Sequence, residues 1–182
     1  VGSSGVTGEC SISDFSITSG DGYPLYILAK DTVAGICPWN DNNMGARFVV
    51  SDAKISGNAA QRIYILSARQ TLYAGGYFGN VNNAVISMEN IGLSYCTIAS
   101  DKVAGVVSSV TGSPLTFKNL CISDNILIGR SGSVAGVINT VPSGSTVTVD
   151  ELYIGDNIFR HAGRSSNTGL IADTVSGKLQ CY

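Results

Sequence analysis

The sequence predicts an all-β protein, a single-domain right-handed parallel β-helix (β-solenoid) of about five coils. Two motifs recur along the chain, and no window of helical length carries an uninterrupted amphipathic stripe. In the first motif Ala or Thr precedes a Gly, at positions 35, 75, 105, 136 and 169, so that the intervals are 40, 30, 31 and 33 residues. Regular intervals of this length are typical of solenoids, in which each repeat contacts only its neighbours.

The second motif lies upstream of each glycine step and consists of a polar pair followed by an apolar, a variable and an apolar residue. Its copies begin at Ser13, Ser51, Glu89, Lys118 and Asp150. Apolar alternation with a period of two indicates a strand. We expect the last apolar residues to form one inward stack of Ile17, Ile55, Leu93, Ile122 and Ile154. A second stack is expected from Ala34, Ala74, Ala104, Ala135 and Thr168.

The strands are expected to pair in parallel within coils of about three strands each. Antiparallel hairpins would need turn dipeptides such as Asn-Gly or Asp-Gly between strands, and Asp21-Gly22 is the only pair of that kind. The predicted solenoid domain spans 10–182, with coils near 10–36, 48–76, 86–107, 117–138 and 149–175. Residues 1–9 are predicted to be a flexible or donated leader. The right hand follows from the usual handedness of parallel crossovers.

An asparagine recurs three residues after the inward isoleucine in three copies, at Asn58, Asn125 and Asn157, and Cys96 takes this place in another copy. Asparagine tolerates left-handed backbone and hydrogen-bonds along a stack. We therefore predict a structural ladder of Asn58, Asn125 and Asn157.

Composition favours an extracellular or cell-surface protein. Charged residues make up 13% of the chain, apolar residues 44%, and the net charge is -2. The scattered basic residues indicate no nucleic-acid partner, and no apolar stretch approaches the ~18 residues of a membrane span. The first residues do not resemble a signal peptide, so a secreted chain is expected to be already processed.

The five cysteines, Cys10, Cys37, Cys96, Cys121 and Cys181, have no metal-binding spacing, and His161 is the only histidine. No metal or cofactor is predicted. The thiols are expected either to be buried or to form disulfides, with Cys96 and Cys121 as the favoured pair. Cys10 and Cys181 are expected at opposite ends of the stack, roughly 20 Å apart.

Two paired elements carry a family resemblance. The first reads Ile122-Ser-Asp-Asn125 and Ile154-Gly-Asp-Asn157, and the second reads Ala135-Gly-Val-Ile138 and Thr168-Gly-Leu-Ile171. These elements resemble the short repeats of polymorphic outer-membrane proteins and other right-handed parallel β-helix surface proteins. The chain has Ile or Leu where that motif has Phe, and Ala-Gly where it has Gly-Gly. The resemblance implies the fold and an extracellular, surface or adhesive setting.

Pectate-lyase-like enzymes are similar in architecture, so a polysaccharide lyase or hydrolase is one alternative. Asp124 and Asp156 occupy equivalent positions, with Arg130 and Arg160 a few residues beyond. The favoured interpretation is that both aspartates are solvent-facing turn residues. A second acidic column, Asp14, Asp52, Glu89 and Asp150, is interrupted by Lys118. It is interpreted as a solvated edge rather than a metal ladder.

An insertion between the first two coils contains the only tryptophan. Trp39, Asn40, Asp41 and Asn42 are a candidate glycan-binding loop, because an aromatic ring stacks on sugars while amides bind hydroxyls. In the opposing interpretation Trp39 is a packed lid over the first coil. A carbohydrate-binding or adhesive module is therefore the other alternative function.

The leading prediction is a non-catalytic extracellular structural subunit that assembles head to tail into a filament or surface layer. No helix-forming segment is present at either end to cover the last strands. The expected interface residues are Val1, Val6, Cys10, Leu179, Cys181 and Tyr182. Cys10 and Cys181 are expected to meet across the junction and to lock it. The predicted partner is a second copy of the chain, with an extracellular glycan as the alternative.

Overall fold

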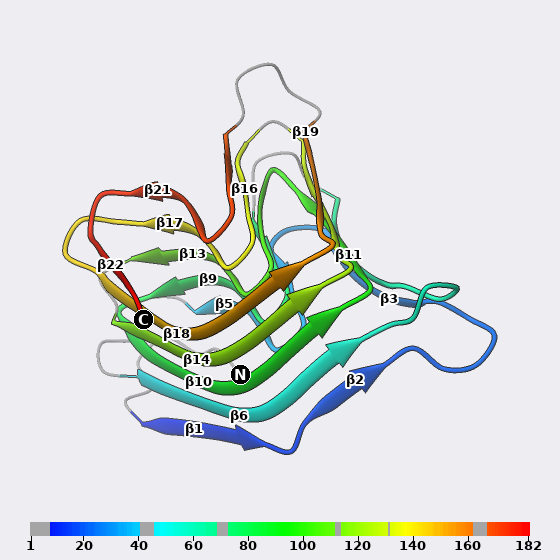
Figure 1. Cartoon of the computed structure of the whole chain (residues 1–182), viewed down its shortest axis with the longest axis horizontal. Coiled ribbons are helices and arrows are strands. Elements are labelled where there is room, and N and C mark those ends of the chain that lie inside the picture. The colour runs from blue at the N-terminus through cyan, green and yellow to red at the C-terminus, as the bar shows by residue number, and fades with distance from the viewer. Residues whose placement is uncertain (1–7, 41–45, 69–72, 112–113, 131, 162–166) are drawn as a thin grey trace.

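The computed structural model describes residues 8–40, 46–68, 73–111, 114–130, 132–161 and 167–182. Within these ranges the chain forms 22 strands and no helix. The strands pair in parallel and build four stacked sheets, which we name A to D (Figure 1). The all-β prediction is confirmed, and the parallel stack is the arrangement that a β-solenoid requires.

The four sheets contain the following strands. Sheet A holds β1 (Glu9–Ser13), β6 (Ala46–Ser56), β10 (Ala84–Ser94), β14 (Leu115–Ser123), β18 (Thr146–Gly155) and β22 (Lys178–Cys181), with β2 (Ser16–Thr18) also paired to β6. Sheet B holds β3 (Leu25–Ala29), β7 (Ile63–Ser67), β11 (Cys96–Ser100), β15 (Ile126–Gly129) and β19 (Ile158–His161). Sheet C holds β4 (Val33–Ala34), β8 (Tyr73–Gly75), β12 (Lys102–Ala104), β16 (Val134–Ala135) and β20 (Thr168–Gly169). Sheet D holds β5 (Cys37–Asn40), β9 (Phe78–Asn82), β13 (Val107–Thr111), β17 (Ile138–Val141) and β21 (Ala172–Val175).

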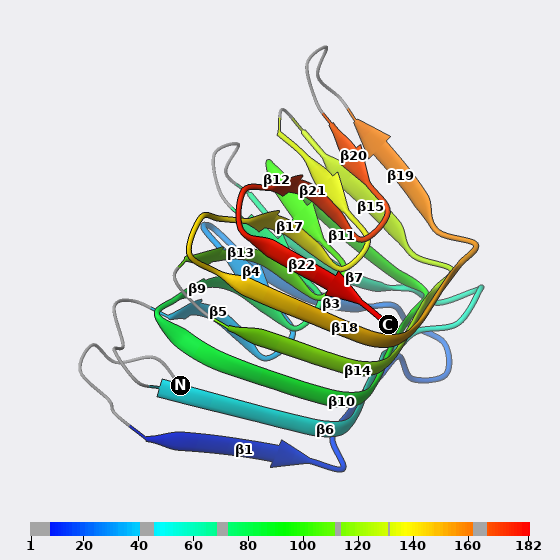
Figure 2. The same ribbon diagram turned by 60° about the vertical axis from the view of Figure 1, so that its left-hand side comes forward.

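The chain passes through sheets A, B, C and D in the same order each time, and we call one such passage a coil. Each coil thus has four strand positions, and the expectation of about three was wrong: a strand of sheet D follows every glycine step. Of the predicted leader, residues 1–7 lie outside the described residues, and Glu9 pairs with Arg47 in sheet A. Figure 2 shows β1 and β22 at opposite ends of sheet A.

The predicted inward stack on sheet A is confirmed. Ile17, Ile55, Leu93, Ile122 and Ile154 share one register column. The three central members are at most 1% exposed, whereas Ile17 and Ile154 are half-buried because each lies in an outer coil. Burying such side chains supplies the main favourable term in folding.

The stack predicted from the glycine step is wrong in two of its members. Ala34, Ala104 and Ala135 align with one another, whereas Ala74 and Thr168 align with the valines of the preceding column, Val33, Val103 and Val134. The reason is one extra residue between the glycine step and the strand of sheet D in these two coils.

The glycines that do align are Gly35, Gly76, Gly105 and Gly136, and Leu170 takes the same place in the coil of β18 to β21. A Cβ atom added at Gly105 would lie 2.1 Å from the carbonyl oxygen of Gly136. Gly76 and Gly136 face the next coil in the same way, at 2.1 and 2.0 Å. Glycine is needed in this column because the backbones of neighbouring coils meet there.

The long strands of sheet A bend at the second residue of each polar pair (Figure 1). Asp14, Asp52, Asn90, Asn119 and Glu151 all have positive φ angles, between 51° and 57°. Asn and Asp are the non-glycine residues that adopt this conformation at least cost. The polar pair therefore marks a corner within the sheet.

Candidate assembly interface

The outer face of the first coil holds an apolar hollow of about 240 Å³. It is lined by Cys10, Ile12, Phe15, Gly35, Ile36, Cys37 and Phe48. Cys37 and Phe48 are buried, whereas the lining residues of β1 are only half-buried. The hollow is the end of the hydrophobic core, because the register columns of Cys10 and Ile12 continue inward to Phe48 and Val50.

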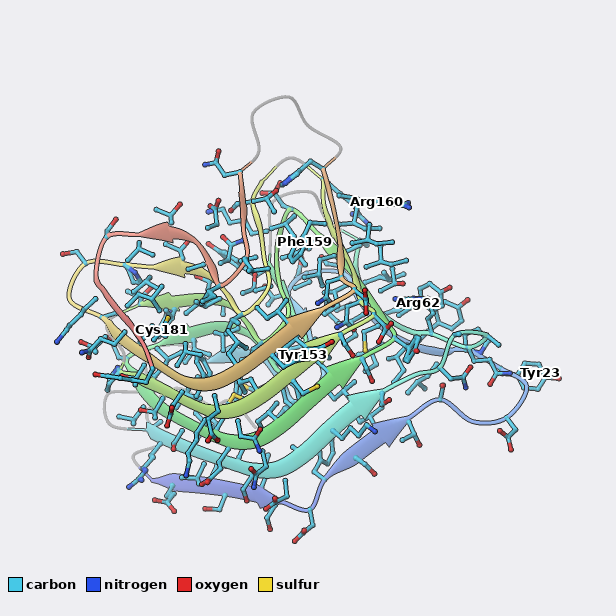
Figure 3. All side chains as sticks on the ribbon, viewed as in Figure 1. Tyr23, Arg62, Tyr153, Phe159, Arg160 and Cys181 are labelled. Carbon is cyan, nitrogen blue, oxygen red and sulfur yellow. The ribbon has the colours of Figure 1, made fainter. Side chains whose placement is uncertain are left out.

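The opposite end of the stack has an equivalent hollow of about 340 Å³. Its lining is formed by Val149, Leu152, Ile154, Leu170, Ile171, Cys181 and Tyr182. Leu170 and Tyr182 project into solvent and are 61% and 76% exposed. Figure 3 shows Cys181 at this end, on the last strand of sheet A.

Both ends also present unpaired strand edges within the part of the chain that the structure describes. Each sheet has its outermost strand bonded on one side only: β1, β3, β4 and β5 at one end and β22, β19, β20 and β21 at the other. Exposed edges of this kind recruit further strands. Apolar ends and unpaired edges therefore coincide.

The predicted interface residues are divided between these two ends. Cys10 lies at the first end, and Leu179, Cys181 and Tyr182 lie at the second. Val1 and Val6 lie outside the described residues. The sequence prediction missed Phe15, Ile36, Leu170 and Ile171, although Leu170 departs from a column that is otherwise glycine.

None of the five cysteines, all of which lie in the described ranges, forms a disulfide. The two cysteines of the predicted disulfide lie in different sheets. Cys96 is buried at the start of sheet B, whereas Cys121 is exposed on sheet A. The Cys96–Cys121 disulfide is therefore wrong. Alternation in β14 directs Cys121 away from the core, since its neighbours Leu120 and Ile122 are buried.

An asparagine ladder occupies the corner between sheets A and B. The Asn125 side-chain amide donates to the Leu93 carbonyl (2.9 Å) and to Asn157 Oδ1 (3.0 Å), and Asn125 Oδ1 accepts from the Cys96 amide (2.9 Å). Asn157 continues the pattern by donating to the Ile122 carbonyl (2.8 Å). The ladder thus satisfies backbone groups that the turn would otherwise leave buried and unpaired.

Asn58 is not part of the ladder, contrary to the prediction. Its side-chain oxygen accepts from the amides of Ala60 and Gln61, which closes a local exposed turn. The aligned position in that coil is Ile63, because residues 57–62 lengthen the corner before sheet B begins.

Cys96 takes the ladder position in the coil of β10 to β13. Burial raises the pKa of its thiol to about 12, although the charge of Arg62 and a hydrogen bond from the Gly57 backbone act in the opposite direction. Arg62 donates to the carbonyls of Cys96 (3.1 Å) and Asp124, and it lies over the Tyr95 ring. Cys96 is therefore a protonated packing residue rather than a nucleophile.

Replacing Asn125 with alanine is expected to destabilise the fold by about 2 kcal/mol, because the buried Cys96 amide and Leu93 carbonyl lose their partners. Urea unfolding measures the change. The matched control is Asn58→Ala, whose exposed turn should cost about 1 kcal/mol or less. Equal losses in the two variants would contradict a structural role for the ladder.

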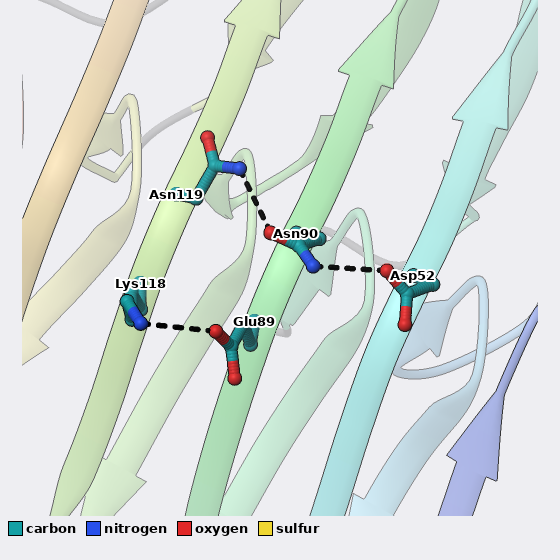
Figure 4. Close-up of polar contacts among 5 residues, drawn as sticks. All are labelled: Asp52, Glu89, Asn90, Lys118 and Asn119. Carbon is teal, nitrogen blue, oxygen red and sulfur yellow. Dashed lines mark hydrogen bonds and ion pairs between the residues drawn. The ribbon is translucent and has the colours of Figure 1, made fainter.

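The acidic column predicted on sheet A is split in two by the register. Glu89, Lys118 and Asp150 align with one another, whereas Asp14 and Asp52 belong to the adjacent column of bend residues. Lys118 lies 3.1 Å from Glu89, and this contact raises the pKa of Lys118. In the bend column Asn119 donates to Asn90 (2.8 Å) and Asn90 donates to Asp52 (2.9 Å), as Figure 4 shows.

The candidate catalytic carboxylates occupy another repeated bend. Asp124 and Asp156 have φ angles of 58° and 52°, and Tyr95 has the same conformation in the coil of β10 to β13. Their recurrence is therefore explained by the corner before sheet B. Among the described residues no group of three or more His, Cys, Asp or Glu side chains is placed to hold a metal ion.

The candidate glycan-binding loop lies largely outside the described residues. Asp41 and Asn42 are not among the described residues, and for Trp39 and Asn40 the structure defines the backbone, as the end of β5, but not the side chains. Trp39 pairs with Asn80, and Asn40 pairs with Val81. The loop therefore starts at the outer edge of sheet D.

A further apolar surface, on the outer face of sheet B, was not predicted. Tyr26, Leu28 and Ile158 are 55%, 66% and 45% exposed, and the Tyr26 and Tyr64 rings stack at 4.9 Å. On β19, Phe159 and Arg160 point to opposite sides (Figure 3). The signal in the sequence was that Leu25–Ala29 and Ile63–Leu66 do not alternate between apolar and polar residues. Such runs are typical of strands with apolar residues on both faces.

Comparisons with family models, curated proteins and solved structures find no match to this chain. In the described residues no helix is long and apolar enough to span a membrane.

Proposed function

We propose that this chain is a non-catalytic structural subunit that assembles head to tail into a filament or surface layer. The observation that carries the proposal is the pair of apolar hollows, one at each end of the same hydrophobic core. Because the two ends differ, contact between them is heterologous and repeats without closing. Such contact would cover both hollows and bring unpaired strand edges of the two ends together.

In this proposal the fold is a right-handed parallel β-helix of about five coils. Five strands in each of sheets B, C and D support the coil number, and the strong preference of parallel crossovers supports the hand. The extracellular setting rests on the low charge content and on the resemblance to β-helix surface proteins. The partner is a second copy of the chain, and the function needs no cofactor.

Sedimentation velocity over a range of concentrations, followed by negative-stain microscopy, tests the proposal. Wild-type protein should form larger species as concentration rises and should appear as filaments or sheets. Tyr182→Ser, at the second hollow, should weaken assembly. Tyr23→Ser removes a similarly exposed tyrosine from the loop between β2 and β3 and should not weaken assembly. A wild-type chain that stays monomeric at high concentration would overturn the proposal.

A further inference from the structure

The strand β22 restricts how one copy can follow another, and the inference drawn from it rests on the proposed head-to-tail assembly. β22 pairs with only the first half of β18, from Thr146 to Val149. β1 pairs with the same half of β6, from Arg47 to Ser51. If the first coil of one copy lay directly on β18 to β21 of another, β1 and β22 would compete for one position.

Leu170 gives a second, independent restriction. At each aligned glycine a Cβ atom would lie 2.0 to 2.4 Å from a carbonyl oxygen of the next coil. Leu170 has a Cβ atom in this column and is 61% exposed. A coil placed directly on Leu170 would bring its Gly35 carbonyl into the same clash. Direct stacking is therefore excluded at two separate places.

We propose that β22 of one copy pairs in parallel with β1 of the next, one strand spacing further along the stack. The repeat register then places Lys178 beside Glu9, Leu179 beside Cys10 and Cys181 beside Ile12. Sheet A continues through the junction as β18, β22, β1 and β6. Over the other sheets, Leu170 and Tyr182 fill the space in front of the hollow formed by Phe15, Ile36 and Phe48.

Charge complementarity supports this register. Glu9 and Lys178 both lie on the outer face of sheet A, and Glu9 already contacts Arg47 at 3.7 Å. Pairing β22 with β1 places the Glu9 carboxylate between two basic side chains. If β22 displaced β1 instead, Lys178 would lie beside Arg47 with no carboxylate between them, which is unfavourable.

The proposed register would not allow the expected disulfide lock. Cys10 and Cys181 are two residues out of register, so their Cα atoms would be roughly 8 Å apart from one strand spacing and two residues of rise. That separation is beyond the reach of a disulfide. The junction is held by backbone pairing and apolar contact, with both thiols facing the core.

Disulfide trapping tests the register. The background is the full chain with Cys10→Ser and Cys121→Ser, which leaves Cys181 as the accessible thiol. In this background Ile12→Cys is expected to cross-link to Cys181 of another copy under mild oxidation and to give a ladder of oligomers on a non-reducing gel. The control Val50→Cys reports strand displacement, because only then would Cys181 lie beside position 50.

The Leu170→Gly variant gives a readout without cysteines. If Leu170 fills the junction, glycine should weaken assembly, with at least a threefold higher concentration needed for half-maximal association. If coils stack directly, glycine should relieve the clash and strengthen assembly. Tyr153→Thr, which removes an exposed aromatic from the outer face of sheet A in the same coil, should have little effect.

The outcomes separate this inference from the proposed function. Assembly together with the Ile12→Cys cross-link supports both. Assembly with the Val50→Cys cross-link alone, with neither cross-link, or with stronger association of Leu170→Gly overturns the proposed register and leaves head-to-tail assembly in place. Wild-type protein that never assembles overturns both.

Discussion

Replacing Gly105 with alanine is expected to destabilise the fold by about 3 kcal/mol or more. The added methyl group would lie 2.1 Å from the Gly136 carbonyl oxygen, and both groups belong to paired backbones. Relieving the contact requires neighbouring coils to separate, which weakens the hydrogen bond from the Gly105 amide to the Ala135 carbonyl. Urea or thermal unfolding followed by circular dichroism measures the loss.

Gly92→Ala is the matched control, because Gly92 lies in the same coil but faces the Lys54 side chain at an ordinary distance of 3.4 Å. The free energy of unfolding of Gly92→Ala should stay within about 0.5 kcal/mol of the wild-type value. Comparable losses of stability in the Gly92 and Gly105 variants would show that close backbone contact between coils does not explain the glycine repeat. Leu170 is already consistent with that explanation, since it occupies the column only where no described coil follows.

The repeat and the inward column of sheet A could be predicted because their signal is local. A polar pair followed by alternating apolar residues specifies both the strand and its buried face. The strands of sheet D could not be predicted in the same way. Asn80, Ser108 and Asn139 are buried within them, and Asn139 donates to the carbonyls of Val103 and Ser133. Buried amides that bind backbone look like loop residues in a sequence.

The exact register between coils needed information that spacing does not contain. One extra residue after Gly75 moves Ala74 out of the predicted stack, and the longer corner at 57–62 moves Asn58 out of the ladder. In both cases the motif is present while the pairing is shifted. Only hydrogen-bonded pairing between coils distinguishes an aligned copy from a displaced one.

Both ends of the core were harder to predict than its middle. The residues of the two hollows follow the same alternation as their buried counterparts, so the sequence does not show that they are uncovered. Cys10 aligns with buried Phe48, and Leu179 aligns with buried Val147. The position of a coil within the stack decides whether an inward side chain is covered.

Ile122→Ala is expected to cost between about 2 and 5 kcal/mol, because a fully buried side chain leaves a cavity between fixed neighbours. Ile122 is 1% exposed and lies between Leu93 and Ile154 in the column. Ile17 belongs to the same column but lies half-buried in the first coil, where the structure can relax. Ile17→Ala should therefore cost less than half as much in the same urea titration. Equal costs for the two variants would mean that the ends of the core are as well covered as its middle, which would count against the open ends on which the proposed assembly depends.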